Sequence, residues 1–317
     1  MAKVPASSPP PLASPSSLPS RTVFVGVDWS GAANPAPTTW VSVLEAGENP
    51  LDPPSLRYCL PLAQVPSTRI GRGGQALGKG PAAYLKLLEV LTPEPQAVVG
   101  IDASFGLPQA LLPPHQPWLE WLATFPQRYP SAEAFRAQCQ QQASALGFAG
   151  KELRRHTDDV AKTPFSPYNL RHYKQCYSVL TYALRPWVQA SKVHVLPFMP
   201  PAPNKPSKPW VVEACPASTL ALSWGFKQPY KGPSPAAHQG RQALLALVQQ
   251  QANLRLPIAL AEQLAGQPTA DGLDSLVIAV RLWQLNTNAP ASHPAWVTPA
   301  AATLGLKAAQ QEGWVYY

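Results

Sequence analysis

Two short apolar runs, each closed by an aspartate, constrain the fold of this chain more than any other feature. The first is residues 23–28 (VFVGVD) and the second is residues 97–102 (AVVGID). Runs that are apolar at every position are typical of strands buried on both faces of a sheet. Such a sheet needs helices on both sides, so we expect an α/β fold.

The order of the other patterns favours one mixed β-sheet flanked by helices. Three strands in quick succession predict an antiparallel meander, and a helix, a strand, further helices, a strand and more helices follow. Residues 1–20, rich in Pro and Ser, predict a disordered tail, and residues 21–317 a single domain with a large helical insertion at about 113–209. Besides the two runs above, the expected strands are 39–44, 56–62, 211–216 and 314–317, and the expected helices are 81–91, 131–146, 169–189, 241–252 and 271–285.

The composition limits where such a protein acts and what it binds. No stretch approaches the roughly 20 apolar residues needed to span a bilayer, and the start lacks the apolar core of a secretory signal. We therefore expect a cytoplasmic protein without a membrane partner. Lys and Arg total 25 against 17 acidic residues, a net charge of +8, which favours polyanions such as nucleic acid. The four scattered cysteines predict reduced, structural thiols.

Five of the 17 acidic residues occupy positions where they could meet. Asp28 and Asp102 close the two buried strands, and Glu213 lies inside a third strand. Asp271 and Asp274 are three residues apart and therefore share one face of a helix, at the end where the helix dipole favours negative charge. We expect these carboxylates to form one cluster.

Each acid also has an ordinary structural interpretation. A lone Asp at a strand end is often a turn or helix cap. Asp271 could be an N-cap, and Glu213 could pair with a nearby Arg. Only the joint placement of the acids favours a functional site.

A cluster of carboxylates predicts a bound cation, because neighbouring carboxylates repel one another and resist ionisation. All-oxygen ligands suit Mg²⁺ or Mn²⁺ rather than zinc. Two such ions, about 4 Å apart, would activate a water and stabilise the leaving oxygen in phosphodiester hydrolysis. The cluster therefore predicts a two-metal-ion nuclease.

Four motifs in order resemble those of the domain-of-unknown-function 429 family, described as predicted ribonuclease-H-like nucleases. The last motif is also similar to the closing D-x-x-D-[AS]-L helix of RuvC-type Holliday-junction resolvases, whose first motif is likewise a G-[IV]-D strand. The resemblance runs from about residue 22 to the C-terminus. The motifs are VGVDWSG at 25–31, VGIDASFGLP at 99–108, VEACP at 212–216 and DGLDSL at 271–276.

The resemblance implies a ribonuclease-H-like fold and assigns roles to the acids. Asp28, Asp102 and Asp274 would be catalytic metal ligands, with Asp271 a fourth ligand and Glu213 an extra or supporting one. Membership of such a family does not by itself establish cleavage.

Basic and aromatic residues interleave between 151 and 174, as in proteins that grip single-stranded nucleic acid. This segment would bind the substrate backbone over the acid cluster. Alternatively, Asp158 and Asp159 pair with Arg154 or Arg155 and fix the loop, while the tyrosines pack in the core. The candidate substrate-binding residues are Lys151, Arg154, Arg155, Lys162, Tyr168, Arg171 and Lys174.

Two rival functions keep the same fold. One is a non-catalytic nucleic-acid-binding or scaffold protein that retains the acids for structural reasons. The other is an actin-like or sugar-kinase-type nucleotide-binding protein, with residues 28–31 as a phosphate-binding turn. A loop at 73–80 nearly spells a Walker A motif but has Gly80 where the Ser or Thr that coordinates Mg²⁺ is required.

Overall fold

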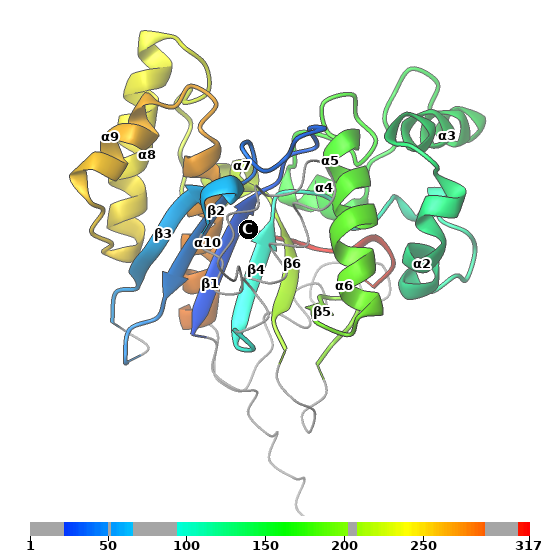
Figure 1. Cartoon of the computed structure of the whole chain (residues 1–317). Coiled ribbons are helices and arrows are strands. Elements are labelled where there is room, and N and C mark those ends of the chain that lie inside the picture. The colour runs from blue at the N-terminus through cyan, green and yellow to red at the C-terminus, as the bar shows by residue number, and fades with distance from the viewer. Residues whose placement is uncertain (1–21, 50–51, 66–93, 202–207, 289–309) are drawn as a thin grey trace, which may run out of the picture.

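A mixed seven-stranded sheet forms the centre of the computed structural model, which describes residues 22–49, 52–65, 94–201, 208–288 and 310–317 (Figure 1). Its order is β3-β2-β1-β4-β6-β5, and β7 pairs with β6. The strands are β1 (Val23–Asp28), β2 (Trp40–Glu45), β3 (Ser55–Pro61), β4 (Ala97–Ile101), β5 (His194–Val195), β6 (Trp210–Ala214) and β7 (Val315–Tyr316).

The first three strands form the antiparallel meander that the sequence predicts. β1 pairs antiparallel with β2, and β2 pairs antiparallel with β3. On its other edge β1 runs parallel to β4, with Val27 opposite Ile101, and β4 runs parallel to β6. The carboxyl ends of β1, β4 and β6 therefore lie at the same edge of the sheet.

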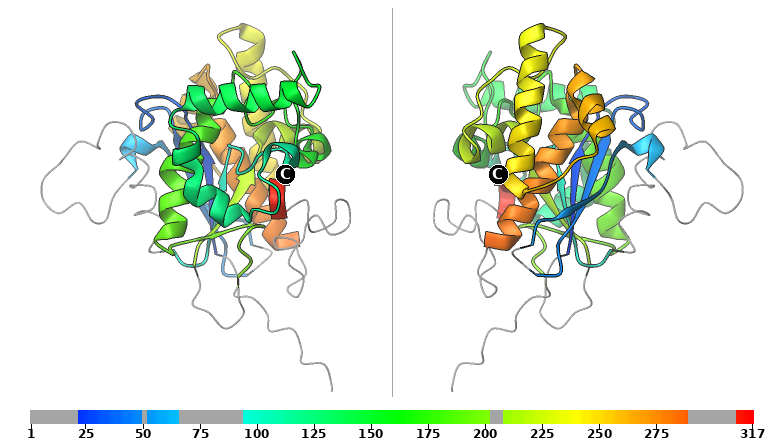
Figure 2. Two further views of the ribbon diagram at one scale, coloured as in Figure 1. Left: turned by 90° about the vertical axis from the view of Figure 1, so that its right-hand side faces the viewer. Right: turned by 90° about the vertical axis from the view of Figure 1, so that its left-hand side faces the viewer.

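Helices cover both faces of the sheet (Figures 1 and 2). α10 packs directly on β1 and β2, with α8 and α9 on the same side. The helices between β4 and β5 lie on the opposite side. The bounds are α2 (Trp118–Arg128), α3 (Ala132–Ala145), α4 (His156–Ala161), α5 (Tyr173–Ser178), α6 (Arg185–Gln189), α7 (Pro216–Ser218), α8 (Pro235–Ala252), α9 (Ile258–Gly266) and α10 (Asp271–Asn288).

Alternation along β1 divides the interior into two cores. Val23, Val25 and Val27 face the helices α2, α3, α5 and α6. Phe24 faces the opposite core, which α8, α9 and α10 complete. Successive side chains of a strand point to opposite faces, so the uninterrupted apolar run reflects burial on both sides.

Two strand glycines allow α10 to lie close to the sheet. A Cβ atom on Gly26 would come within 1.9 Å of the carbonyl oxygen of Ser275, and one on Gly100 within 2.6 Å of a methyl group of Ile278. The glycine that precedes each strand-end aspartate by two residues is therefore a packing requirement. It brings the first turn of α10 beside the ends of β1 and β4.

The predicted insertion is not wholly helical, because it contains β5, a two-residue strand that pairs with β6. The helix expected at 169–189 begins at Tyr173 and continues through a π-helical stretch, Val179–Leu184, into α6. The sequence patterns also missed α9. The expected tail at 1–20, the helix at 81–91 and the loop at 73–80 lie outside the described residues. Among the described helices, none is long and apolar enough to cross a membrane.

Candidate functional site

The ends of β1 and β4 place two aspartates side by side. Asp28 is the last residue of β1, and Asp102 directly follows β4. The backbone N–H of Asp102 donates to the carbonyl oxygen of Val27 at 2.9 Å, which continues the parallel ladder past the end of β4. Both carboxylates therefore emerge at the same edge of the sheet, as the sequence predicts.

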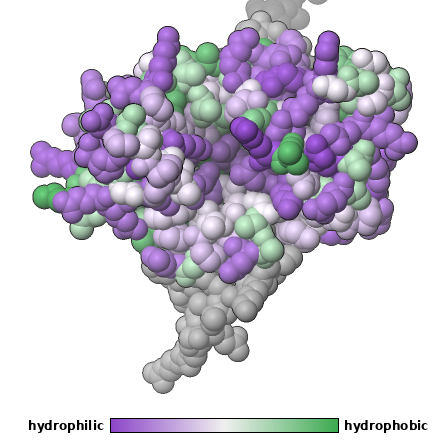
Figure 3. All heavy atoms as spheres, turned by 90° about the horizontal axis from the view of Figure 1, so that it is seen from above, coloured by the Kyte–Doolittle hydropathy of each residue, from purple (hydrophilic) through white to green (hydrophobic). Residues whose placement is uncertain are grey.

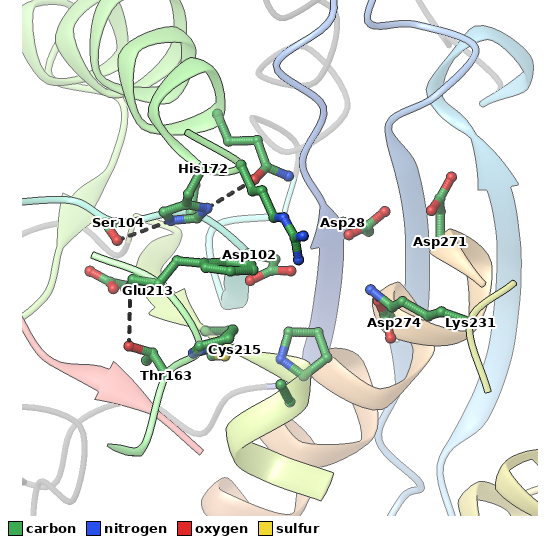
Figure 4. Close-up of a pocket in the computed structure, with 18 of the residues that line it drawn as sticks. Asp28, Asp102, Ser104, Thr163, His172, Glu213, Cys215, Lys231, Asp271 and Asp274 are labelled. Atoms are coloured by element: carbon green, nitrogen blue, oxygen red, sulfur yellow. Dashed lines mark hydrogen bonds and ion pairs between the residues drawn. The ribbon is translucent and has the colours of Figure 1, made fainter. Parts of the chain in front are cut away.

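The first turn of α10 brings two more carboxylates to this edge. Asp271 is the first residue of α10, and the N–H of Asp274 donates to the carbonyl oxygen of Ala270 at 2.9 Å. In the close-up of Figure 4, both side chains lie beside Asp28. Three elements far apart in the sequence thus meet at one place.

The four aspartates line one cavity of about 280 Å³. Loop residues Thr163 and His172, together with Lys231, line other parts of it (Figure 4). Figure 3 shows this face of the molecule from above, with hydrophilic side chains around a central hollow. The cavity has room for a small ligand or a short part of a larger one.

Burial and mutual repulsion raise the pKa of three of these carboxyl groups. Burial raises the pKa of Asp28 well above its ordinary value, and the charges of Asp274, Asp102 and Asp271 raise it further, while Lys231 opposes them. Burial, with the charge of Asp274, raises the pKa of Asp102 to about 6. Burial also raises the pKa of Asp271. The negative charge of the cluster is therefore incompletely compensated by the chain.

Asp274 differs from the other three because a hydroxyl donates to one of its oxygens and an ammonium lies beside the other. The hydroxyl of Tyr230 donates to Oδ1 at 2.9 Å, and the ammonium of Lys231 lies 2.6 Å from Oδ2. The Asp274 side chain is 1% exposed. Neither Tyr230 nor Lys231 was expected from the sequence, because nothing in the loop pattern around them marks a site.

Glu213 belongs to a buried ion-pair network. Its Oε2 accepts from Nη1 of Arg155 at 2.8 Å and from the N–H of Phe105 at 2.9 Å. Arg155 is fully buried and also binds Asp158, with Nη2 to Oδ1 at 2.7 Å. The alternative that Glu213 pairs with an Arg is thus confirmed. Both carboxylate oxygens of Glu213 are engaged by Arg155, so Glu213 is a supporting residue rather than a free ligand.

A chain of hydrogen bonds orients His172 at the cavity wall (Figure 4). Nε2 of Gln175 donates to the carbonyl oxygen of Trp29 at 2.7 Å, so its Oε1 accepts from Nδ1 of His172 at 2.9 Å. Nε2 of His172 then accepts from Oγ of Ser104 at 3.1 Å, and that Oγ accepts from Arg155. In this network a neutral imidazole would carry its proton on Nδ1 and accept at Nε2.

The predicted basic segment divides into structural and cavity-facing residues. Tyr168 is buried, and its hydroxyl accepts from the N–H of Leu153. Arg155 is buried in the network above, which corrects its predicted contact with substrate. Arg154 pairs with Asp159 and donates to the carbonyl oxygen of Thr163. The alternative that the arginines pair with Asp158 and Asp159 to fix the loop is therefore confirmed.

Of the remaining basic residues, two lie near the acids. Arg171 lines the cavity, and Lys174 lines an adjoining hollow together with Arg171, Asp28 and Asp271. The exposed residues Lys151 and Lys162 are not among those that line either space in the described part of the chain.

The four cysteines are free and buried. Cys215 lines the cavity, but burial, with the charge of Asp102, raises the pKa of its thiol to about 12. Its thiolate is therefore scarce at neutral pH, and cysteine nucleophilic chemistry is disfavoured here.

The donor chemistry of the cavity suits a hard divalent cation. Within the described residues, no group of three or more His, Cys, Asp or Glu side chains stands ready to hold a metal. Nevertheless Asp28, Asp102 and Asp271 offer only oxygen ligands, the type that Mg²⁺ and Mn²⁺ prefer. Burial and the neighbouring carboxylates raise the pKa of all three, so their charged forms are disfavoured unless a positive charge lies nearby. The type of ligand atom that these three residues offer therefore matches such an ion.

Comparisons of the chain with protein-family models, with curated proteins and with solved structures find no match.

Proposed function

We propose that this chain is a Mg²⁺- or Mn²⁺-dependent nuclease of ribonuclease-H-like fold. One observation carries the proposal: carboxylates from β1, β4 and α10 converge on one cavity, where burial and their own repulsion raise the pKa of Asp28 and Asp102. An arrangement that opposes its own ionisation is costly to fold, and a bound cation would relieve the cost.

The topology is consistent with the fold proposed. An antiparallel meander is followed by parallel strands at its β1 edge, and a final long helix packs back on β1. The acids lie at the ends of β1 and β4 and in the first turn of α10, and this convergence supports the proposal.

Asp28, Asp102 and Asp271 would hold the ion. When bound, the ion supplies positive charge that polarises a phosphoryl oxygen and neutralises the charge developing on the leaving oxygen. The chain's own residues would bind and position the substrate. Arg171 and Lys174 would bind backbone phosphates next to the acids, and His172, held by Ser104 and Gln175, would form a rigid wall that positions the substrate.

The basic character of the chain supports a polyanionic substrate. The chain has a net charge of +8 although acids gather at the cavity. A negatively charged polymer is therefore attracted to the protein as a whole. A nucleic acid, with a phosphate at every nucleotide, matches both the basic residues and the need for a cation at the acids.

A cleavage assay tests the proposal. Wild type, Asp28→Asn, Asp102→Asn and the control Glu262→Gln would be incubated with single-stranded, duplex and hybrid substrates, with Mn²⁺ or with EDTA. Glu262 is exposed on α9, outside the cavity. We expect Mn²⁺-dependent cleavage by wild type and Glu262→Gln, and its loss in both Asp variants. Cleavage that survives in both Asp variants, or binding of every substrate without cleavage, would contradict the proposal; the second result would favour a non-catalytic binding protein.

A further inference from the structure

Lys231 places a positive charge inside the acid cluster. It lies in the loop that precedes α8, and its Nζ is 2.6 Å from Oδ2 of Asp274. Its side chain is 57% exposed, whereas that of Asp274 is 1% exposed. The lysine therefore approaches a buried carboxylate from the solvent side of the cavity, with its charged end pointing inward.

The same ammonium acts on the other carboxylates. Its charge lowers the pKa of Asp28 and Asp102, against the stronger effect of burial. In return, although burial opposes its charge, Asp274, Asp102 and Asp28 raise the pKa of Lys231 above its ordinary value. The Lys231 side chain thus supplies a positive charge to the cluster of aspartates.

Both oxygens of Asp274 already lie next to donors of the chain, and Lys231 places a positive charge beside one of them. Tyr230 holds Oδ1 and Lys231 holds Oδ2. An ion that bound to Oδ2 would lie beside the ammonium, and like charges this close repel strongly in a partly buried site. An ion that displaced Lys231 would have to replace an ion pair to a carboxylate that has almost no access to water.

We propose that the cavity holds one divalent ion, on the side of Asp28, Asp102 and Asp271, and that Lys231 takes the place of a second ion. A phosphodiester in the cavity would then lie between the metal ion and the ammonium. This inference rests on the proposed function and replaces the two-ion site expected from the sequence. It assigns to Lys231 direct contact with the substrate phosphate.

The stoichiometry of Mn²⁺ binding tests the inference without reference to activity. Free Mn²⁺ would be measured by electron paramagnetic resonance during titration of wild type, Lys231→Met, Lys231→Arg and Lys227→Met. Lys227 is an exposed lysine in the same loop and serves as the matched control. We expect one ion per chain for wild type, Lys227→Met and Lys231→Arg, and two for Lys231→Met, in which the position beside Asp274 becomes available.

The possible outcomes separate the two proposals. Two ions in wild type, or one ion in a folded Lys231→Met variant, would overturn the inference about Lys231 and leave a metal site in place. No binding in wild type would overturn the proposed function itself. Because Lys231→Met leaves Asp274 without its cation and could fail to fold, Lys231→Arg provides a second test: it keeps the charge, so a second ion in this variant would also contradict the inference.

Discussion

Nη1 of Arg155 lies 2.8 Å from Oε2 of Glu213, and both side chains are almost completely buried. This pair joins the loop before α4 to β6, and Glu213 also lines the cavity. The same guanidinium donates to the carbonyl oxygen of Glu312 near the C-terminus and to Oγ of Ser104. One arginine therefore holds together several segments that meet under the acid cluster.

Removing Arg155 should destabilise the protein strongly. Arg155→Met leaves the buried carboxylates of Glu213 and Asp158 without their cation, and such losses cost about 3–5 kcal/mol. The matched variant is Arg154→Met, because Arg154 is partly exposed and pairs with a largely exposed Asp159. Its loss should cost about 1–2 kcal/mol, because the exposed pair contributes little and the bonds to the carbonyl oxygens of Asp158 and Thr163 are also lost. Urea denaturation measures both. Equal costs for the two variants would show that the buried network does not stabilise the fold.

Gly26 should tolerate no side chain. Gly26→Ala places a Cβ atom 1.9 Å from the carbonyl oxygen of Ser275, so α10 must move away from β1. We expect a loss of at least about 1–3 kcal/mol, together with weaker Mn²⁺ binding, since Asp271 and Asp274 move with the helix. The control is Gly266→Ala in α9, where a Cβ atom would meet nothing within 4 Å. Thermal melts with and without Mn²⁺ measure both effects. Unchanged Mn²⁺ binding in a destabilised Gly26→Ala variant would contradict the claim that the packing of α10 on β1 positions the acids.

The acids should make stability depend on pH in the absence of metal. The pKa of Asp102 rises from 3.8 to about 6 in the folded state, through burial and the charge of Asp274. A raised pKa means that the folded state holds the proton more tightly. The stabilising contribution of this group is therefore full below about pH 4 and is lost as the pH rises through about 6.

Asp102→Asn should remove this dependence. In EDTA, the free energy of unfolding of the variant should increase relative to that of wild type as the pH rises from 4 to 7. A tenfold change in proton affinity corresponds to about 1.4 kcal/mol, so the gain at pH 7 should be on the order of 1–3 kcal/mol. Urea denaturation across this pH range, with Glu262→Gln as the control, provides the measurement. A difference that is independent of pH, or one that shrinks toward pH 7, would contradict the assigned environment of Asp102.

Arg171 and Lys174 should contribute to binding through phosphate contacts. If each neutralises one phosphate, Arg171→Ala and Lys174→Ala should each lower the slope of log affinity against log salt by about 0.7 for single strands. The control is Lys192→Ala, because this exposed lysine precedes β5 and so lies toward the opposite edge of the sheet. Binding would be followed by fluorescence anisotropy in EDTA, where no cleavage is expected. Unchanged slopes for Arg171→Ala and Lys174→Ala would exclude them as phosphate contacts.

Much of the fold could be predicted because its signals are local. The runs that end in Asp28 and Asp102 carry their own burial pattern, and the apolar stripe of α10 marks one face of a helix. Parallel strands end at the same edge, so the meeting of these acids followed from strand type alone. In contrast, β5 has two residues and depends entirely on pairing with β6.

The site was less predictable where it depends on ion pairs between residues far apart in the sequence. Arg155 is one of several basic residues in its segment, and only the tertiary structure places it against Glu213. Lys231 has no pattern in its loop that distinguishes it from Lys227, yet only Lys231 reaches Asp274. The spacing of the acids along the chain predicted that they lie close together. It could not show which basic side chain pairs with each acid.

The most direct test of the central claim is a calorimetric titration of Mn²⁺ into wild type and into the double variant Asp28→Asn/Asp102→Asn. We predict saturable binding to wild type and none to the double variant, which should be folded and at least as stable as wild type in EDTA, because the repulsion among the acids is relieved. Absence of binding to wild type, or equal binding to both proteins, would contradict the claim that these aspartates form a metal centre.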